Sequence, residues 1–269
     1  MLAGSFLSMM EIPMRFSALA ALALGLTAVA AAPAFAQTAP AQTANWSYFG
    51  KTGPLVWGKL DPAYRACSQG HEQSPIDIRG THLNKALQPI EFHYISGPIT
   101  LVNDGRTITA QVDPGSYIVA NGARYNLTGF IFHHPSEEAV KGRLSDMEVQ
   151  LLHRAAGGKL AVVDVRLVEN PGKPNATLAT LWQHLPATAG TSEKIEEMVN
   201  PGGLLPADRS YWTYTGSLTT PPCTEGVSWF VFEQELSLDR DQLRAFAALF
   251  RMNTRGLQDP HKRRIEASE

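Results

Sequence analysis

Two short segments carry most of the side chains that can bind a metal ion or move a proton. The first, FIFHHPSE, spans residues 130–137, and the second, EVQLLH, spans residues 148–153. Imidazole and carboxylate groups are common zinc ligands, and a catalytic zinc ion needs three protein ligands and an open position for water. The chemistry to look for is therefore activation of water by a metal.

Both segments read as β-strands, in which successive side chains point to opposite faces. Ile131 and His133 then share one face of the first strand, and Glu148 and Gln150 share one face of the second. The face that could bind a metal thus offers one imidazole, one carboxylate, one amide and one aliphatic side chain. We expect such a set to hold a metal only weakly.

Two further histidines, His134 and His153, are predicted to face away from this site. Recruiting either of them would need a one-residue shift of register. Such a shift would turn every core side chain of that strand outward. His133 is therefore the one imidazole that we expect at the site, and its alternative role is that of a buried, hydrogen-bonded histidine.

Short β-type runs separated by turn residues predict a mostly β domain built on a large sheet. The predicted strands are residues 99–102, 107–112, 117–120, 130–133, 147–153, 160–167 and 227–232. The predicted helices are short, at residues 176–185, 192–199 and 241–250, with Asn175, and Ser237 or Asp239, as candidate N-caps.

The N-terminal residues indicate targeting. Arg15 precedes an apolar run at residues 16–32, and the residues AFA at 34–36 fit a cleavage site. We expect a secretory signal peptide at residues 1–36, a flexible lead-in at 37–45 and a single domain at 46–269, located in the periplasm or outside the cell. The alternative is that the apolar run stays as a membrane anchor.

The charge of the chain limits the classes of partner that we expect. The net charge is −2 and no Arg-rich run is present, so we expect no nucleic-acid partner and, once the signal is cleaved, no stable membrane anchor. No binding partner can be named.

The two cysteines, Cys67 and Cys223, favour one disulfide in an oxidising compartment, and two buried free thiols are the alternative.

Several segments resemble the α-class carbonic anhydrases. They are WSY at 46–48, QSPIDI at 73–78, the two segments described above, GSLTTPPC at 216–223 and NTR at 253–255. They cover about residues 46 to 265 in the family's order. The resemblance implies a large, central, twisted, mainly antiparallel sheet with short peripheral helices and a conical cleft. The cysteine positions also resemble the disulfide of secreted and bacterial members.

Active members hold zinc with three imidazoles, and the zinc-bound hydroxide attacks carbon dioxide to give bicarbonate. The resemblance implies that Thr219 and Glu137 form the hydrogen-bond relay to this hydroxide, and that Glu148 orients the third imidazole. The carbon dioxide pocket would be lined by Val162, Leu152 and Leu218.

The chain departs from this pattern at the metal ligands. Ile131 stands at the first ligand position and Gln150 at the third, which leaves His133 alone. Arg106 stands near the proton-shuttle position, and arginine stays protonated at neutral pH. Gly129 replaces a glutamine that would support the missing first ligand.

We therefore expect a binding or scaffold protein of this family with no resident cofactor, similar to the carbonic-anhydrase-related proteins. Its cleft remains available to a small molecule. The alternative is an active or weakly active zinc carbonic anhydrase with an unusual metal site.

Overall fold

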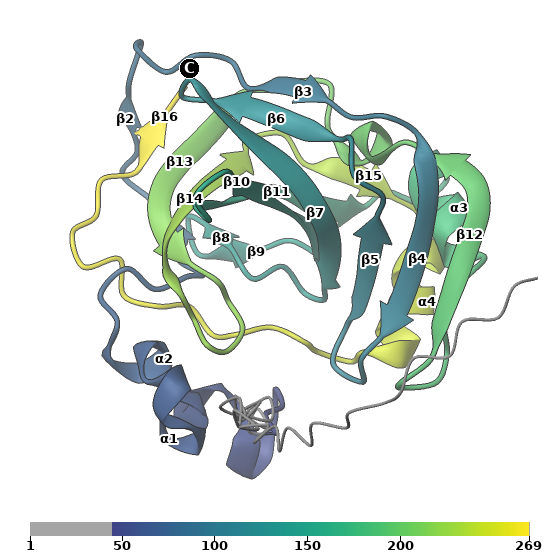
Figure 1. Ribbon diagram of the computed structural model, residues 1–269, viewed down its shortest axis with the longest axis horizontal. Coiled ribbons are helices and arrows are strands. Elements are labelled where there is room, and N and C mark those ends of the chain that lie inside the picture. The colour runs from purple at the N-terminus through teal and green to yellow at the C-terminus, as the bar shows by residue number, and fades with distance from the viewer. Residues whose placement is uncertain (1–44, 269) are drawn as a thin grey trace, which may run out of the picture. The chain divides into compact units, whose positions relative to one another are not determined.

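The computed structural model describes residues 45–268, in which β-strands predominate (Figure 1). The predicted signal peptide at 1–36 lies outside the described residues, as does the lead-in at 37–45 except for Asn45. Within residues 45–268, no helix is long and apolar enough to cross a membrane.

Thirteen strands of the described chain form one large sheet, in which most neighbours are antiparallel. The order along the sheet is β12 (Ser192–Val199), β4 (Gly97–Asn103), β5 (Ile108–Val112), β7 (Ala123–His133), β10 (Met147–Ala155), β11 (Leu160–Glu169), β14 (Glu225–Phe232), β13 (Tyr211–Ser217), β16 (Glu266–Ala267) and β2 (His82–Leu83). Three strands attach to this path: β15 (Leu236–Leu238) pairs with β11, and β6 (Tyr117–Ala120) joins β3 (Glu91–His93) to β7. The prediction of a mainly antiparallel sheet is confirmed. The sheet is nevertheless mixed, because three of its pairs are parallel: β11–β14, β11–β15 and β16–β2.

The remaining elements are short. A second sheet contains β1 (Asp77–Ile78), β8 (Ala139–Val140) and β9 (Arg143–Leu144). The α-helices are α1 (Trp57–Leu60), α2 (Ala66–Gln69), α3 (Ala176–Trp182) and α4 (Arg240–Leu249), and 3-10 turns occur at Gly50–Thr52, Pro54–Val56, Pro62–Tyr64 and Pro201–Leu204. Helices α3 and α4 contact each other near β12 (Figure 1).

The predicted strands are all present, and β7 is longer than expected because it begins at Ala123. The helix predicted at residues 192–199 is wrong, since this segment forms the strand β12. Ile195 and Val199, four residues apart, gave it a helical pattern, yet it pairs with β4 at the edge of the sheet. Backbone pairing with β4 outweighs that weak pattern, because propensity is only a weak prior against tertiary context.

Helices α3 and α4 begin where their capping residues predict. The Asn175 side chain accepts a hydrogen bond from the Leu178 amide at the start of α3. Asp239, rather than Ser237, caps α4 and forms a capping box with Gln242. Side-chain caps satisfy backbone amides that have no partner within the helix.

The two faces of the central strands differ in chemistry. One face is apolar, with Phe130 and Phe132 of β7 and Val149 and Leu151 of β10 fully buried in a core that also contains residues of α3 and α4. The opposite face has a smaller apolar cluster around Trp229, and the polar residues of the predicted site lie on this face of β7, β10 and β11.

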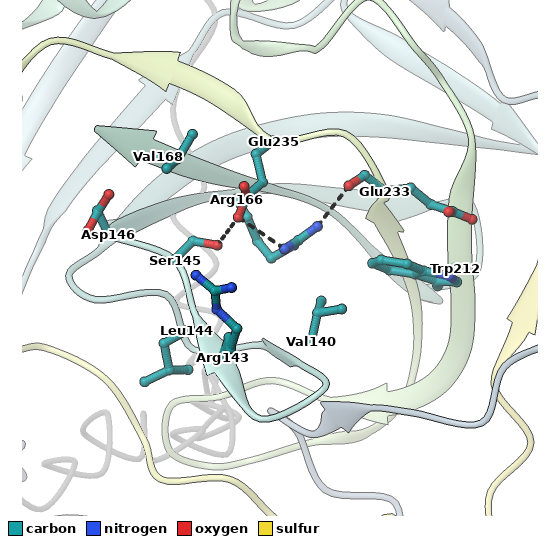
Figure 2. A pocket seen from close by; sticks show the side chains of 10 residues that line it. All are labelled: Val140, Arg143, Leu144, Ser145, Asp146, Arg166, Val168, Trp212, Glu233 and Glu235. Carbon is teal, nitrogen blue, oxygen red and sulfur yellow. Dashed lines mark hydrogen bonds and ion pairs between the residues drawn. The ribbon is translucent and has the colours of Figure 1, made fainter. Parts of the chain in front are cut away.

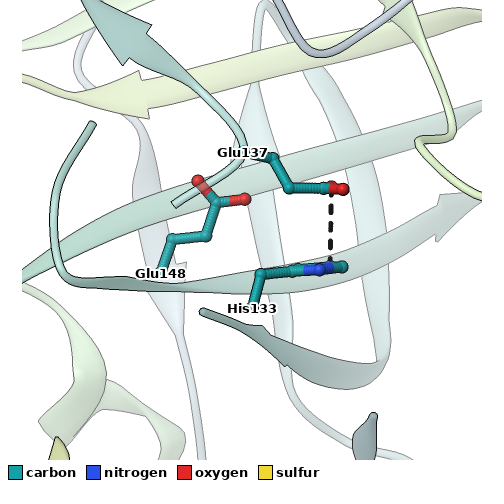
Figure 3. A group of neighbouring side chains, drawn as sticks. All are labelled: His133, Glu137 and Glu148. Atoms are coloured by element: carbon teal, nitrogen blue, oxygen red, sulfur yellow. Dashed lines mark ion pairs between the residues drawn. The ribbon is translucent and has the colours of Figure 1, made fainter. Parts of the chain in front are cut away.

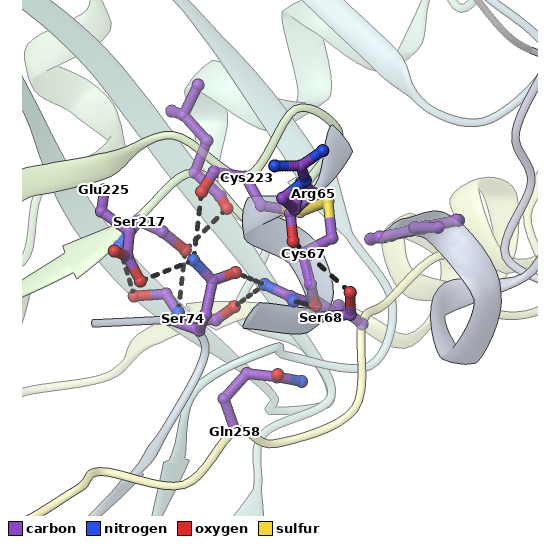
Figure 4. The surroundings of a disulfide bond; sticks show 12 residues. Arg65, Cys67, Ser68, Ser74, Ser217, Cys223, Glu225 and Gln258 are labelled. Atoms are coloured by element: carbon purple, nitrogen blue, oxygen red, sulfur yellow. Dashed lines mark hydrogen bonds between the residues drawn. A yellow bond between two sulfur atoms is a disulfide. The ribbon is translucent and has the colours of Figure 1, made fainter. Parts of the chain in front are cut away.

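Cys67 and Cys223 form a disulfide, as predicted, with a sulfur–sulfur distance of 2.06 Å (Figure 4). Around it, the QSPIDI and GSLTTPPC segments meet. The Gln73 amide donates to the Cys223 carbonyl at 3.1 Å, and the Ser74 amide donates to the Ser217 hydroxyl at 2.9 Å. The guanidinium of Arg255 donates to the Cys67 carbonyl at 2.8 Å. The disulfide therefore joins segments that lie far apart in the sequence.

Candidate functional site

The register of three neighbouring strands places the polar side chains in two rows across the sheet. In the first row, Ile131 of β7 pairs with Gln150 of β10, which pairs with Asp164 of β11. In the second row, His133, Glu148 and Arg166 occupy the corresponding positions. The predicted ligand positions are therefore adjacent in space, as the face-by-face interpretation of the sequence requires.

His133 is completely buried, and its two ring nitrogens have different surroundings. Nδ1 donates a hydrogen bond to the backbone carbonyl of Asn253 at 2.7 Å. Nε2 has no hydrogen-bond partner and points toward Glu137, whose Oε2 lies 3.6 Å away (Figure 3). The bond at Nδ1 fixes the orientation of the ring, so Nε2 is directed at Glu137.

The side-chain amide of Gln150 bridges two buried carboxylates. Its nitrogen lies 2.9 Å from Glu137 Oε2 and 2.6 Å from Glu148 Oε1, and it donates to both. This bridge joins β10 to the turn that carries Glu137.

Glu137 does not form the relay with Thr219 that the resemblance implies. Its Oε1 accepts from the Arg255 amide at 2.7 Å, and its Oε2 accepts from Gln150. Among the hydrogen bonds of residues 45–268, none joins Glu137 to the buried Thr219. Both carboxylate oxygens of Glu137 thus have other donors, the Arg255 amide and the Gln150 side chain.

Four acids gather around this site, and two of them were not predicted as site residues from the sequence. Burial and the charge of Glu137 raise the pKa of Glu148 to about 7. Burial raises the pKa of Glu138 well above its usual range, although Glu138 accepts hydrogen bonds from the Tyr214 hydroxyl and the Ile76 amide.

Asp164 is the second acid that was missed. Both of its carboxylate oxygens are buried without a hydrogen-bond partner, and burial raises its pKa well above the usual range. The sequence contained one indication of this acid. Asp164 lies within the apolar run at residues 160–168, where burying a carboxylate is costly.

Arg166, two residues after Asp164, is directed into a separate cavity of about 440 Å³ (Figure 2). The cavity is also lined by Val140, Arg143, Leu144, Ser145, Asp146, Val168, Trp212, Glu233 and Glu235. Arg166 Nη1 lies 3.2 Å from a carboxylate oxygen of Glu235. The positive charge of Arg166 lowers the pKa of Asp164, but by less than burial raises it.

The three residues that the resemblance assigns to a carbon dioxide pocket belong to one apolar cluster. Val162 is buried beside Trp229, and Leu152 and Leu218 pack against the same cluster. Near the shuttle position, the Arg106 guanidinium lies 4.3 Å from the Trp46 ring and pairs with Asp104 at 3.3 Å. Arg106 therefore has structural partners on the protein surface.

Gly129 has a backbone conformation that explains the loss of a side chain at this position. Its φ is +153°, and a Cβ built there would lie 2.5 Å from the Ala110 carbonyl oxygen of β5. A longer side chain would collide with the neighbouring strand unless the backbone moved.

His134 and His153 do not join the site. The backbone carbonyl of Arg251 accepts a hydrogen bond from His134 Nδ1 at 3.1 Å. His153 lies in the apolar face, where its Nδ1 donates to the Leu151 carbonyl at 2.9 Å and its Nε2 accepts from the Tyr94 hydroxyl at 2.8 Å. These bonds suit a neutral imidazole.

Burial lowers the pKa of His153 to about 3, which predicts a loss of stability in acid. The unfolded chain takes up a proton near pH 6.5 that the folded chain takes up only near pH 3. His153 therefore lowers the free energy of unfolding as the pH falls from about 6.5 toward 3. The expected decrease between pH 7 and pH 5 is about 2 kcal/mol. Denaturation of wild type and His153→Gln at both pH values should show the smaller pH dependence in the variant. Equal pH dependence of the two proteins would contradict the assignment.

The residues present do not fit the zinc ion of an active α-class site. Zinc prefers imidazole and thiolate ligands, and here one imidazole faces an aliphatic side chain and an amide that is already bound to two carboxylates. No step of carbon dioxide hydration can therefore be assigned to these residues.

The mixed sheet, with a disulfide and a polar site on its central strands, defines a β-sheet protein of the carbonic anhydrase type. The family model for eukaryotic-type carbonic anhydrase matches residues 52–269. The chain therefore belongs to the α-class carbonic anhydrase family.

Known relatives agree with this membership. The chain is 41% identical over 217 residues to a carbonic anhydrase of Klebsiella pneumoniae, which covers 80% of this chain and 87% of that protein. It is 35% identical over 250 residues to a carbonic anhydrase of Nostoc, covering 90% and 94%.

Solved structures share the fold. A hyperthermostable carbonic anhydrase from a hydrothermal vent chimney superposes with a TM-score of 0.80 at 39% identity, covering 84% of this chain and 100% of that one. Dioscorin, solved in complex with ascorbate, superposes with a TM-score of 0.75 at 28% identity, covering 83% and 97%.

Proposed function

We propose that this protein is a non-catalytic member of the α-class carbonic anhydrase family that acts by binding or as a scaffold. The observation that carries this proposal is the Gln150 amide, which bridges Glu137 and Glu148 where an active site needs an imidazole and a threonine relay. Efficient hydration of carbon dioxide by this route requires a metal-bound hydroxide.

The same proposal places the protein in the periplasm or outside the cell. The disulfide supports this location, because such bonds persist in oxidising compartments. Leu152 and Leu218 stay partly exposed beside the buried Val162, and these two apolar side chains support the proposed binding of a small molecule. Its chemical identity does not follow from these residues.

A second candidate is an active or weakly active carbonic anhydrase with an unusual metal site. The names of the relatives, which are carbonic anhydrases, favour it. Under this alternative zinc, or another metal, would supply the reactive hydroxide.

Hydration of carbon dioxide measured in a stopped-flow instrument separates the two candidates. Wild-type protein equilibrated in turn with zinc, cobalt and iron should hydrate carbon dioxide no faster than buffer containing the same metal. A rate that grows with protein concentration for any of these metals would overturn the proposal and establish the second candidate.

A further inference from the structure

Three electron-pair donors converge beside Gln150. They are His133 Nε2 and one carboxylate oxygen each from Glu137 and Glu148, and all three lie within 4.8 Å of one another (Figure 3). No hydrogen-bond donor of the described residues approaches His133 Nε2. A neutral imidazole would thus direct its lone pair at a carboxylate oxygen 3.6 Å away, and either a proton or a metal ion between the two atoms would remove this repulsion.

Each of the three groups is held by a hydrogen bond on its outer side. His133 Nδ1 donates to the Asn253 carbonyl, Glu137 Oε1 accepts from the Arg255 amide, and Glu148 Oε2 accepts from the Glu138 amide at 3.2 Å. Their inner atoms face one another, and the Gln150 amide donates to the inner oxygens of both carboxylates. Backbone groups that orient ligands in this way are typical of metal sites, where they fix the tautomer of the histidine and the rotation of the carboxylates.

Gln150 can complete such a set. Its amide nitrogen now serves as the hydrogen-bond donor between Glu137 and Glu148. Rotation of the amide by 180° would present its oxygen at the same place, because the two ends of the amide are nearly equal in size. Metal–ligand bonds of about 2.0 to 2.2 Å put opposite ligands about 4 Å apart, so small side-chain rotations suffice to close the site.

We propose that His133, Glu137, Glu148 and Gln150 form an oxygen-rich site for a divalent first-row metal ion of the manganese or iron class. This set differs from three imidazoles on zinc, because carboxylate and amide oxygens dominate it. Two carboxylates also balance the charge of a divalent ion in a buried site. The site does not depend on the loss of hydratase activity.

Manganese binding to metal-free protein tests the site. Wild-type protein treated with chelator should bind about one manganese ion per chain in calorimetry. Glu148→Gln and Glu137→Gln should weaken this binding by about 10-fold or more, since each removes a charged ligand with almost no change in shape. The matched control is Glu235→Gln, an acid of the separate cavity that pairs with Arg166, and it should bind manganese as wild type does. Absent binding in wild type, or equal weakening in all three variants, would overturn the site.

Pulsed electron paramagnetic resonance gives a second readout that needs no variant. Manganese bound to wild-type protein with ¹⁵N-labelled histidine should show coupling to one imidazole nitrogen. No such coupling would overturn the site, even if manganese bound. If the protein binds no manganese, the metal site is overturned but the proposed lack of carbon dioxide hydration is not. If the manganese-loaded protein hydrates carbon dioxide, the proposed lack of hydration is overturned but the metal site is not.

Discussion

The double variant Ile131→His with Gln150→His should retain about one zinc ion per chain after dialysis, in contrast to wild type. Ile131 and His133 lie on one face of β7, and Gln150 is the cross-strand partner of Ile131. Three imidazoles on these positions would converge as a catalytic zinc site requires. Removing the Gln150 amide would also free Glu137 to accept a hydrogen bond from Thr219.

Elemental analysis of the two single variants provides the matched control. Each of them supplies two imidazoles and should lose most of its zinc during dialysis against buffer. The double variant should also hydrate carbon dioxide above the wild-type background, because zinc-bound water ionises near pH 7. A folded double variant without zinc would show that the strands do not present these positions to a common point.

Replacing both cysteines by serine should lower the free energy of unfolding by about 2 to 5 kcal/mol. The disulfide closes a loop of 156 residues, so it restricts a large part of the unfolded chain. A single domain has about 5 to 15 kcal/mol of stability in total, which makes this one of the largest expected effects of any substitution in the chain.

Urea denaturation of Cys67→Ser with Cys223→Ser measures this loss. Wild-type protein kept reduced by dithiothreitol is the control and should be destabilised to the same extent. A loss under about 1 kcal/mol in both cases would mean that the link contributes little beyond the contacts of its neighbours, such as Arg255 with Cys67.

The alternation of side chains along β7 and β10 allowed the two faces to be assigned from the sequence. Side chains alternate strictly along a strand, so Ile131 and His133 had to share a face whatever the rest of the fold. The disulfide could also be predicted, since a chain with two cysteines has only one possible pairing.

The partners of these residues across the sheet could not be predicted in the same way. The position of Asp164 beside Gln150 depends on the register of β10 with β11, which no local pattern records. The bridge from Gln150 to Glu137 depends on a turn between two strands. The strand at residues 192–199 was missed because its pairing with β4 comes from tertiary structure.

Zinc K-edge X-ray absorption of tag-free wild-type protein equilibrated with zinc counts the imidazoles around the ion. His133 supplies the one imidazole at this place, so the structure predicts at most one imidazole per zinc, and the double variant provides the three-imidazole reference spectrum. Three imidazoles on zinc in the wild-type protein would contradict the proposal that this chain lacks the three-imidazole metal centre of the family.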